Sequence, residues 1–292
     1  MTMAYLDVKT NPVVNAFLVW MQKCDKPGKY ALFSWLNKHH PNTLICYKMP
    51  LGQFVIPAHE WCFWQLGGPQ NYYLDEFMPF IELINKQNSA FSFFDLGADI
   101  GTVSALINRH CDHAAQTIAF EPNQGAFSLL SHNMASCTRN GKAVNKALSN
   151  FNGMASLHTR QRTLGDHEGY IEKDAQGDTQ VTSLDSYIDN EKIELNSVVV
   201  LKIDVEGQEV QVVEGASNTI SQAKTCIILI EIHPDVLDKL NQTPETLFDA
   251  VEAIRPVEWL IPKAGNISLD RSRPLFSQVE KAQYDVIAVS RS

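Results

Sequence analysis

The 292-residue sequence lacks closely spaced cysteines, clustered basic residues and long apolar runs. Its six cysteines are scattered and form no C-x-x-C pair, which argues against a zinc knuckle or a redox motif. Free, mostly buried thiols are typical of a reducing compartment. No signal peptide is recognisable, so we expect a cytoplasmic protein.

The absence of clustered basic residues and of long apolar runs argues against nucleic acids as partners and against a segment that spans a membrane. The formal net charge is −9 without any basic block, so we expect no nucleic-acid binding, which needs clustered Lys and Arg. The longest early apolar run, residues 16–21, is far too short to cross a bilayer, and we expect no membrane span. The oligomeric state stays open, and a homo-oligomer is compatible with the sequence.

What the sequence does contain is an ordinary globular composition, with 45% hydrophobic and 20% charged residues. The length favours one α/β domain with an appendage over two equal domains. We place a helical and mixed cap region at residues 1–88 and a ligand-binding domain at residues 89–292. The cap is dense in aromatic residues, including Tyr73, which would line a substrate cleft or, more simply, pack the appendage onto the main domain.

Residues 91–101 form the stretch around which the chain is organised. An apolar run leads into Asp95, Gly97 and Gly101, and a helical pattern follows. A dinucleotide site needs G-x-G-x-x-G, so that backbone N–H groups face a pyrophosphate. Here the middle glycine is missing, and a carboxylate at Asp95 would repel phosphate but suits a cationic ligand such as S-adenosylmethionine. The alternative is a turn that merely requires glycine.

Two later strands extend this pattern. Residues 116–123 predict a second strand ending at Glu121, 24 residues beyond the first glycine. That spacing is close to the roughly 20 residues expected for a carboxylate that binds ribose hydroxyls. Residues 143–149 predict a third strand, and Lys146 and Ala147 near its end would border the adenine in such an architecture.

Polar residues follow two buried, β-branched runs further along the chain. Residues 198–203 lead to Asp204, and residues 226–230 lead to Glu231 and His233. Ligands of open α/β sheets bind at the carboxyl ends of the strands, and neighbouring strands lie about 4.8 Å apart. We therefore expect these three side chains to converge if the two strands are neighbours.

Other segments carry expectations for the fold. Residues 208–221 predict one continuous helix. Residues 257–262 and 284–290 predict an antiparallel strand pair that closes the sheet. Residues 160–180 are polar and aperiodic, and they predict either a mobile lid over the site or a solvated loop.

Taken together, the motifs resemble the FkbM-type family of S-adenosylmethionine-dependent methyltransferases. They are Asp-Leu-Gly-Ala-Asp-Ile-Gly at 95–101, Phe-Glu-Pro at 120–122, Thr-Ser-Leu-Asp at 182–185, Leu-Lys-Ile-Asp-Val-Glu-Gly at 201–207 and Glu-Ile-His at 231–233. One departure is Asp99, where the family usually shows Asn. The resemblance implies a class I methyltransferase fold: a Rossmann-like, seven-stranded α/β sheet, mostly parallel with an antiparallel C-terminal strand.

The resemblance also implies S-adenosylmethionine as the cofactor and methyl transfer, usually to a hydroxyl of a sugar or natural product, as in polysaccharide biosynthesis. Together with the patterns above, it gives the predicted cofactor site: Asp95, Gly97, Ala98, Asp99, Gly101, Glu121, Pro122, Lys146, Ala147 and Asp204. The predicted partner is a small-molecule or glycan acceptor, bound by Glu206 and Tyr73.

Transfer to an alcohol requires removal of its proton, and His233 is the best candidate for the general base. An unperturbed histidine titrates at about 6.5, although a structural role before Pro234 is an equal alternative. Asp204 is the second candidate base, or it holds the cofactor or orients His233, and Glu231 completes the predicted catalytic set. Glu206 and Glu231 would bind acceptor hydroxyls. With Asp204 they would instead hold Mg²⁺, but the spacing requires no metal and we predict none.

Two other functions stay open. A nicotinamide-dependent oxidoreductase uses a similar sheet, but the missing glycine and Asp95 count against it. A non-catalytic module would keep the fold as a binding platform. The intact polar residues at the strand ends count against this second alternative.

Overall fold

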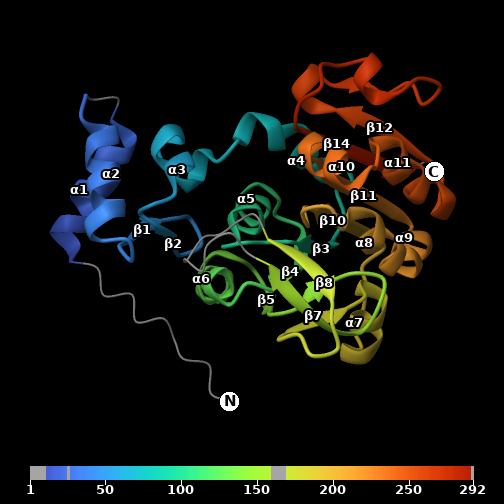
Figure 1. The fold of residues 1–292 in the computed structure, drawn as a ribbon, viewed down its shortest axis with the longest axis horizontal. Helices are drawn as coiled ribbons and strands as arrows, with labels where there is room; N and C mark the ends of the chain where they lie inside the picture. The colour runs from blue at the N-terminus through green and yellow to red at the C-terminus, as the bar shows by residue number, and fades with distance from the viewer. Residues whose placement is uncertain (1–10, 25–26, 159–168, 291–292) are drawn as a thin grey trace.

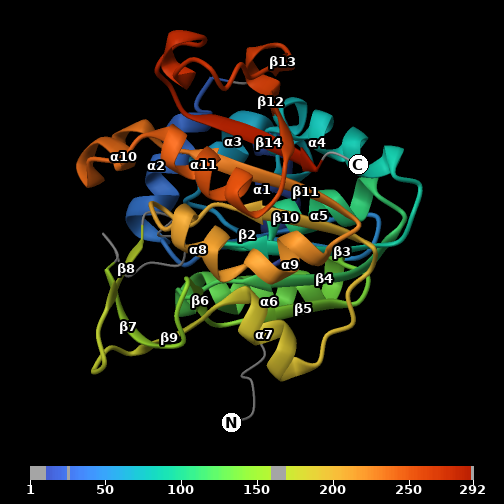
Figure 2. The ribbon, with the colours of Figure 1, turned by 90° about the vertical axis from the view of Figure 1, so that its right-hand side faces the viewer.

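The computed structural model describes residues 11–24, 27–158 and 169–290 (Figure 1). An eight-stranded sheet forms its centre, with helices on both faces (Figure 2). In spatial order the strands are β13 (Ile267–Ser268), β12 (Val257–Ile261), β14 (Tyr284–Ser290), β11 (Thr225–Ile232), β10 (Val198–Ile203), β3 (Phe91–Leu96), β4 (Ala114–Phe120) and β5 (Gly141–Val144).

The strand directions match the predicted architecture. Strands β5, β4, β3, β10 and β11 run parallel to one another, whereas β14 runs antiparallel between β11 and β12. The mostly parallel sheet with an antiparallel C-terminal strand is therefore confirmed. The two-residue β13 adds an eighth strand at one edge, beyond the seven that were predicted.

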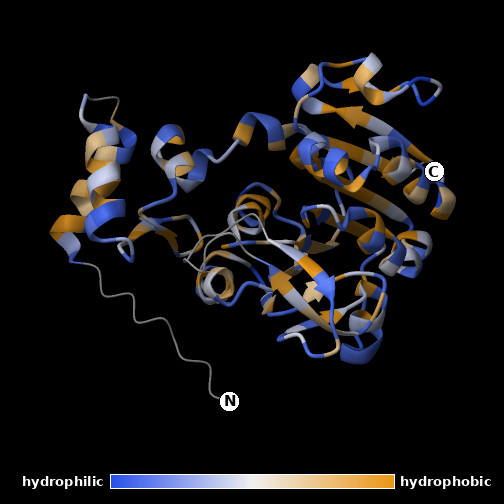
Figure 3. Ribbon diagram, in the orientation of Figure 1, coloured by the Kyte–Doolittle hydropathy of each residue, from blue (hydrophilic) through white to orange (hydrophobic). Residues whose placement is uncertain are grey.

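The central strands bury both of their faces. The helices around them are α4 (Leu74–Lys86), α5 (Thr102–His110), α6 (Gln124–Cys137), α7 (Leu184–Glu191), α8 (Glu209–Gly215), α9 (Ser217–Gln222), α10 (Pro234–Leu240) and α11 (Pro244–Ile254). Successive strand residues point to opposite sides, so Phe94 and Leu201 pack with α7, α8, α9 and α11, while Phe93 and Val200 pack with α4 and α5. Figure 3 shows the apolar residues concentrated on these strands.

The first part of the cap region packs against α5 and α6. Its elements are α1 (Pro12–Lys23), α2 (Lys29–His39), β1 (Leu44–Lys48), β2 (Gln53–Pro57) and α3 (Trp61–Leu66). Phe33 and Trp64 share a hydrophobic cluster with Leu129 of α6. Asn133 of α6 accepts a hydrogen bond from Val55 N of β2 at 2.7 Å and donates to Val55 O at 2.9 Å.

Two expected elements are divided in the structure. The strand predicted at 143–149 ends at Val144, and the chain then enters a second sheet with the order β6-β9-β7-β8. Its strands are β6 (Ala147–Leu148), β9 (Thr179–Thr182), β7 (Gly153–His158) and β8 (Tyr170–Lys173). The helix predicted at 208–221 breaks at Ala216, next to Gly215, on which a Cβ would lie 2.2 Å from Ser149 O.

The structure describes residues 169–180 of the segment 160–180 that was predicted as a lid or loop. Residues 159–168 lie outside the described residues, whereas 170–173 and 179–182 are the strands β8 and β9. Within the described ranges, no helix is both long and apolar enough to cross a membrane.

Asn133→Ala is expected to destabilise the fold. The side chain is 1% exposed, and it also donates to Ile100 O at 2.9 Å, so its loss leaves several buried backbone groups unpaired. We expect the free energy of unfolding to fall by about 2–4 kcal/mol. Urea denaturation measures this, with Asn190→Ala on the exposed end of α7 as the control. An unchanged midpoint for Asn133→Ala would contradict the role assigned to this contact.

Candidate active site

A cavity of about 570 Å³ opens where β3, β4, β10 and β11 end. Its size suits a small-molecule ligand, since such sites occupy roughly 300–1,000 Å³. Twelve of the predicted site residues line it: Tyr73, Gly97, Ala98, Asp99, Glu121, Pro122, Lys146, Ala147, Asp204, Glu206, Glu231 and His233. Asp95 and Gly101 do not.

The turn after β3 brings the backbone very close to the end of β10. Gly97 has φ +80°, and a Cβ there would lie 1.8 Å from Asp204 O, so only glycine fits. Asp99 is also left-handed, with φ 48°, and its N–H donates to Glu121 Oε2 at 2.9 Å. The turn therefore connects the ends of three neighbouring strands.

Asp95 and Gly101 were expected to contact the ligand, but in the structure they contact other protein groups and do not line the cavity. Asp95 is fully buried, accepts a hydrogen bond from Ser104 Oγ at 2.6 Å and lies 3.7 Å from Lys202 Nζ. Its carboxylate faces the protein interior because these two partners hold it there. Gly101 allows α5 to pack on α6, since a Cβ would lie 2.8 Å from Leu130 Cδ1.

Glu121 presents a buried carboxyl group to the cavity. It accepts hydrogen bonds from Asp99 N at 2.9 Å and Asn123 N at 2.8 Å, one on each oxygen. Burial, reinforced by nearby Asp99, raises the pKa of Glu121 to about 7, although these backbone N–H groups oppose the shift. Each oxygen keeps acceptor capacity for a further donor.

Lys146 and Ala147 lie where the chain passes from β5 to β6. Lys146 Nζ sits 5.8 Å from the ring centroid of Tyr187, a cation–π distance. Nearby, Asn145 donates to Glu121 O and Pro122 O at 2.8 and 3.0 Å. The Asn145 side chain thereby holds the end of β4 against the loop that borders the cavity.

Lys202 and Asp204 form the buried ion pair at the end of β10. Lys202 Nζ lies 2.9 Å from Asp204 Oδ2 and donates to Gly97 O at 2.6 Å. Burial alone would raise the pKa of Asp204, but Lys202, His233 and Glu231 together hold that pKa well below its ordinary range.

His233 lies among three carboxylates at the end of β11. Its Nε2 is 3.2 Å from Glu231 Oε2, 3.7 Å from Asp204 Oδ1 and 4.0 Å from Glu206 Oε1. Burial favours the neutral ring, but the neighbouring carboxylates of Asp204 and Glu231 outweigh it and raise the pKa of His233 to about 11. The expected convergence is observed, and the acids that surround the ring move the pKa of His233 above the neutral range expected for an unperturbed histidine.

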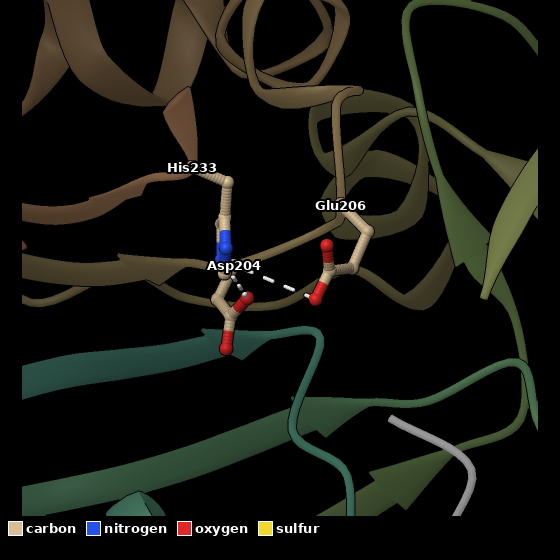
Figure 4. A group of neighbouring side chains, drawn as sticks. All are labelled: Asp204, Glu206 and His233. Carbon is tan, nitrogen blue, oxygen red and sulfur yellow. Dashed lines mark ion pairs between the residues drawn. The ribbon is translucent and has the colours of Figure 1, made fainter. Parts of the chain in front are cut away.

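Glu206 approaches this cluster from the loop after β10 (Figure 4). Its backbone is left-handed, with φ 51°, and burial raises the pKa of its carboxyl to about 7. One ligand atom from each of Asp204, Glu206 and His233 lies within 4.8 Å of the others. This trio is geometrically able to hold a metal ion, although exposed acids are common without one.

Comparison with known proteins places this site in a family. Residues 95–255, more than half of the chain, match the family described as "Methyltransferase FkbM domain". The chain belongs to the FkbM family of methyltransferases. These are S-adenosylmethionine-dependent enzymes, so the predicted family, fold class and cofactor are confirmed.

One curated relative of this FkbM chain is the hexuronic acid methyltransferase AglP of Haloferax volcanii, 26% identical over 144 residues. The match covers 49% of this chain and 56% of the relative, so the chain spans little more than half of that protein's length.

The chain is distantly similar to solved methyltransferase structures. Methyltransferase FkbM from Methylobacillus flagellatus KT is 17% identical with a TM-score of 0.41, covering 68% of this chain and 43% of that one. A methyltransferase from Agrobacterium tumefaciens is 8% identical with a TM-score of 0.44, covering 87% of this chain and 72% of that one.

The cap region supplies one wall of the FkbM-domain cavity. Trp61 of α3, Tyr72 and Tyr73 line it, whereas Trp64 is fully buried beneath. Tyr73 has φ 37°, is 43% exposed and meets the Tyr72 ring edge-on at 4.9 Å. The aromatic residues of the cap therefore include both cleft-lining and packing side chains, the two roles that the sequence left open.

Asp285 is a cavity residue that sequence reasoning missed. It belongs to β14 and lies directly opposite Glu231 of β11. Burial, with Glu231 and Asp204 nearby, raises the pKa of Asp285 to about 8. The available signal was one acid within the otherwise apolar run at 284–289, but only the strand register shows which neighbour it faces.

Glu121→Gln is expected to flatten the pH dependence of stability. The pKa of Glu121 rises from 4.5 to about 7 on folding, so between these values only the folded protein holds the proton. The free energy of unfolding then falls as pH rises, by at most about 3 kcal/mol for this group.

In urea denaturation between pH 4.5 and 7, the free energy of unfolding of Glu121→Gln should fall less steeply with pH than that of the wild type. Glu82→Gln, an exposed change on α4, is the control and should retain the wild-type slope. Parallel curves for the wild type and Glu121→Gln would show that Glu121 titrates normally in the folded state.

Proposed function

We propose that the protein is an S-adenosylmethionine-dependent O-methyltransferase that methylates a hydroxyl of a saccharide or glycosylated natural product. The observation that carries this proposal is the continuous cavity between Glu121 at one strand end and the Asp204–His233 pair at another. One side suits a nucleoside, and the other offers groups that bind and deprotonate an alcohol. The named sugar substrate of the Haloferax volcanii relative supports this acceptor class.

The cofactor would lie along the ends of β3 and β4. The backbone of residues 97–99 lines this end of the cavity, and the free acceptor capacity of Glu121 fits the two adjacent hydroxyls of a ribose. Lys146 and Ala147 border the space left for the adenine. S-adenosylmethionine supplies a methyl group that its positively charged sulfur already activates, so the protein mainly has to align donor and acceptor.

His233 is the proposed proton acceptor. The ring of His233 would take up the proton of a bound acceptor hydroxyl, and Asp204 and Glu231 would stabilise the resulting imidazolium. In the free protein these acids keep the ring protonated. A cation bound nearby lowers the pKa of His233 toward neutrality, because like charges disfavour the protonated form. The low pKa of Asp204 makes it a weak base and favours its role in orienting the ring.

The cap region, residues 1–88, is proposed to complete the acceptor side. Trp61 and Tyr73 offer aromatic faces there, which suit the apolar faces of sugar rings. Glu206 is proposed to accept hydrogen bonds from acceptor hydroxyls.

Calorimetry should detect binding of S-adenosylmethionine and of its demethylated product in the micromolar range. Glu121→Ala removes the proposed ribose acceptor and should weaken both by about 10–100-fold, the usual effect of losing a charged hydrogen-bond partner. Glu82→Ala, exposed on α4, should bind normally. No binding of either compound to the wild type would exclude the proposed function.

His233→Ala should slow turnover while cofactor affinity stays unchanged. We expect a loss of about 10²–10⁴-fold, typical of removing a general base. NMR titration adds a readout that a structural role would not move. The ring pKa should be lower with S-adenosylmethionine bound than with the demethylated product, which lacks the sulfonium charge. Unchanged turnover, or equal pKa values in the two complexes, would remove His233 from the mechanism.

A further inference from the structure

Exposed hydrophobic side chains gather at the start of the cap region. Eleven large hydrophobic side chains are exposed in the described structure, and six of them lie within residues 13–35. These six are Val13, Val14, Phe17, Trp20, Tyr30 and Trp35, all on α1 and α2. Single residues of this kind are normal on a protein surface, whereas a concentration of them marks an interaction site. Figure 1 shows the two helices at one end of the molecule, away from the C-terminal strands.

Helix α1 is apolar around most of its circumference but packs on one side only. Leu18 and Gln22 are buried on that side. Asn15 accepts a hydrogen bond from Cys46 N of β1 at 2.7 Å and donates to Cys46 O at 2.9 Å. Lys23, at the end, is the one charged residue of the helix. A helix that is apolar all round is usually buried all round, and α1 is not.

The opposite side of α1 carries a stripe of apolar side chains. Val13, Phe17 and Trp20 follow the i, i+4, i+7 spacing of one helix face and are 79%, 47% and 52% exposed. The rings of Phe17 and Trp20 lie 6.1 Å apart. At about 100° per residue, this face points directly away from the side that packs on β1. We call these three residues the α1 stripe.

Helix α2 adds exposed rings that have polar or basic neighbours. The Trp35 ring, half exposed, lies 5.6 Å from the His39 ring and 5.0 Å from the His40 ring. Lys38 is exposed in the same turn of the helix. The Tyr30 ring meets the Trp61 ring edge-on at 5.1 Å, and Trp61 lines the cavity. The exposed surface and the cavity therefore share the cap region.

The charge of this part of the chain is opposite in sign to that of the whole. Residues 11–59 contain five lysines and one acid, Asp25, although the net charge of the chain is −9. The lysines are spread along the sequence and form no block, but α1 and α2 bring several of them beside the exposed rings. Lys23, Lys29 and Lys38 have no ion-pair partner among the described residues. The surface thus combines exposed apolar groups with unpaired positive charge.

This combination fits a lipid membrane better than a second copy of the chain. In a two-fold symmetric pair the same surface meets itself, so the lysines of both copies would approach each other without carboxylates between them. Anionic lipid headgroups supply the negative charge that this surface lacks, and the acyl boundary takes up valine and aromatic side chains. Tryptophan and tyrosine are enriched at the membrane–water interface for the same reason.

We infer that the α1 stripe docks the protein on the surface of an anionic lipid membrane. The 12-residue helix would lie in the plane of the interface, with Phe17 and Trp20 inserted and the lysines beside the headgroups. Such docking needs no long apolar run, so it agrees with the expectation that no segment spans the bilayer. It is independent of the proposed methyl transfer.

Vesicle flotation tests the docking directly. The full chain is mixed with vesicles of phosphatidylcholine alone or with about one-third phosphatidylglycerol. We expect partitioning into the anionic vesicles to be at least about tenfold stronger, since each lysine near the surface contributes about fivefold. High salt should remove most of this preference, because it screens the headgroup charge. Absence of binding, or equal binding to both kinds of vesicle, would overturn the inference.

Variants test whether the α1 stripe makes the contact. Phe17→Ser combined with Trp20→Ser should weaken partitioning by at least about tenfold, because two large apolar side chains no longer insert. Serine has a helix propensity similar to that of Phe and Trp, so α1 should persist. Tyr170→Ser combined with Leu240→Ser removes side chains of similar exposure on β8 and α10 and should bind as the wild type does. Unchanged partitioning of the folded stripe variant would overturn the inference.

A charge variant provides a second test that leaves the apolar face intact. Lys23→Glu combined with Lys38→Glu should abolish the preference for anionic vesicles, whereas Glu82→Lys, on α4, should leave the preference in place. A retained preference in the folded lysine variant would contradict the proposed docking.

Sedimentation without vesicles separates the membrane from a second copy. We expect the same oligomeric state for the wild type and for the Phe17→Ser, Trp20→Ser variant over a range of concentrations. An oligomer of the wild type that dissociates in this variant would assign the α1 stripe to contact between copies and would overturn the inference.

Discussion

The buried ammonium group of Lys202 holds the ends of two strands and a glycine turn in one arrangement. It donates to Gly97 O, pairs with Asp204 and lies 3.7 Å from the buried carboxylate of Asp95. Without this cation, two carboxylates would stay uncompensated at the ends of β3 and β10, which is strongly unfavourable. The position of Asp204, and through it the orientation of His233, depends on this interaction.

The carboxyl groups at the sheet edge around Lys202 differ in their pKa values. Lys202 and His233 keep Asp204 ionised, whereas burial and neighbouring acids raise the pKa values of Glu121, Glu206 and Asp285 to about 7 or 8. The cavity therefore combines a carboxylate that is held ionised, Asp204, with three carboxyl groups whose pKa values lie near neutral pH. A charged ligand changes this balance as soon as it binds.

Much of this arrangement could be predicted from local sequence patterns. The strand–Gly97–helix unit, the acid after the second strand and the polar residues after β10 and β11 each follow from periodicity within one segment. The orientation of Asp95 could not be predicted, because Lys202, which draws it inward, lies 107 positions away in the sequence. The place of Asp285 depends on the register between β11 and β14, and the break at Ala216 accompanies a close approach to Ser149.

The position of β14 has a consequence for biosynthesis. This strand follows β12 in the chain, yet it inserts between β11 and β12 in the sheet. While the ribosome is still translating residues 284–290, β11 has an open edge and the cavity has no wall at Asp285. Such an exposed strand edge invites pairing with other chains. Folding would therefore depend on rapid docking of β14, or on a chaperone that covers the open edge of β11, before the pocket forms.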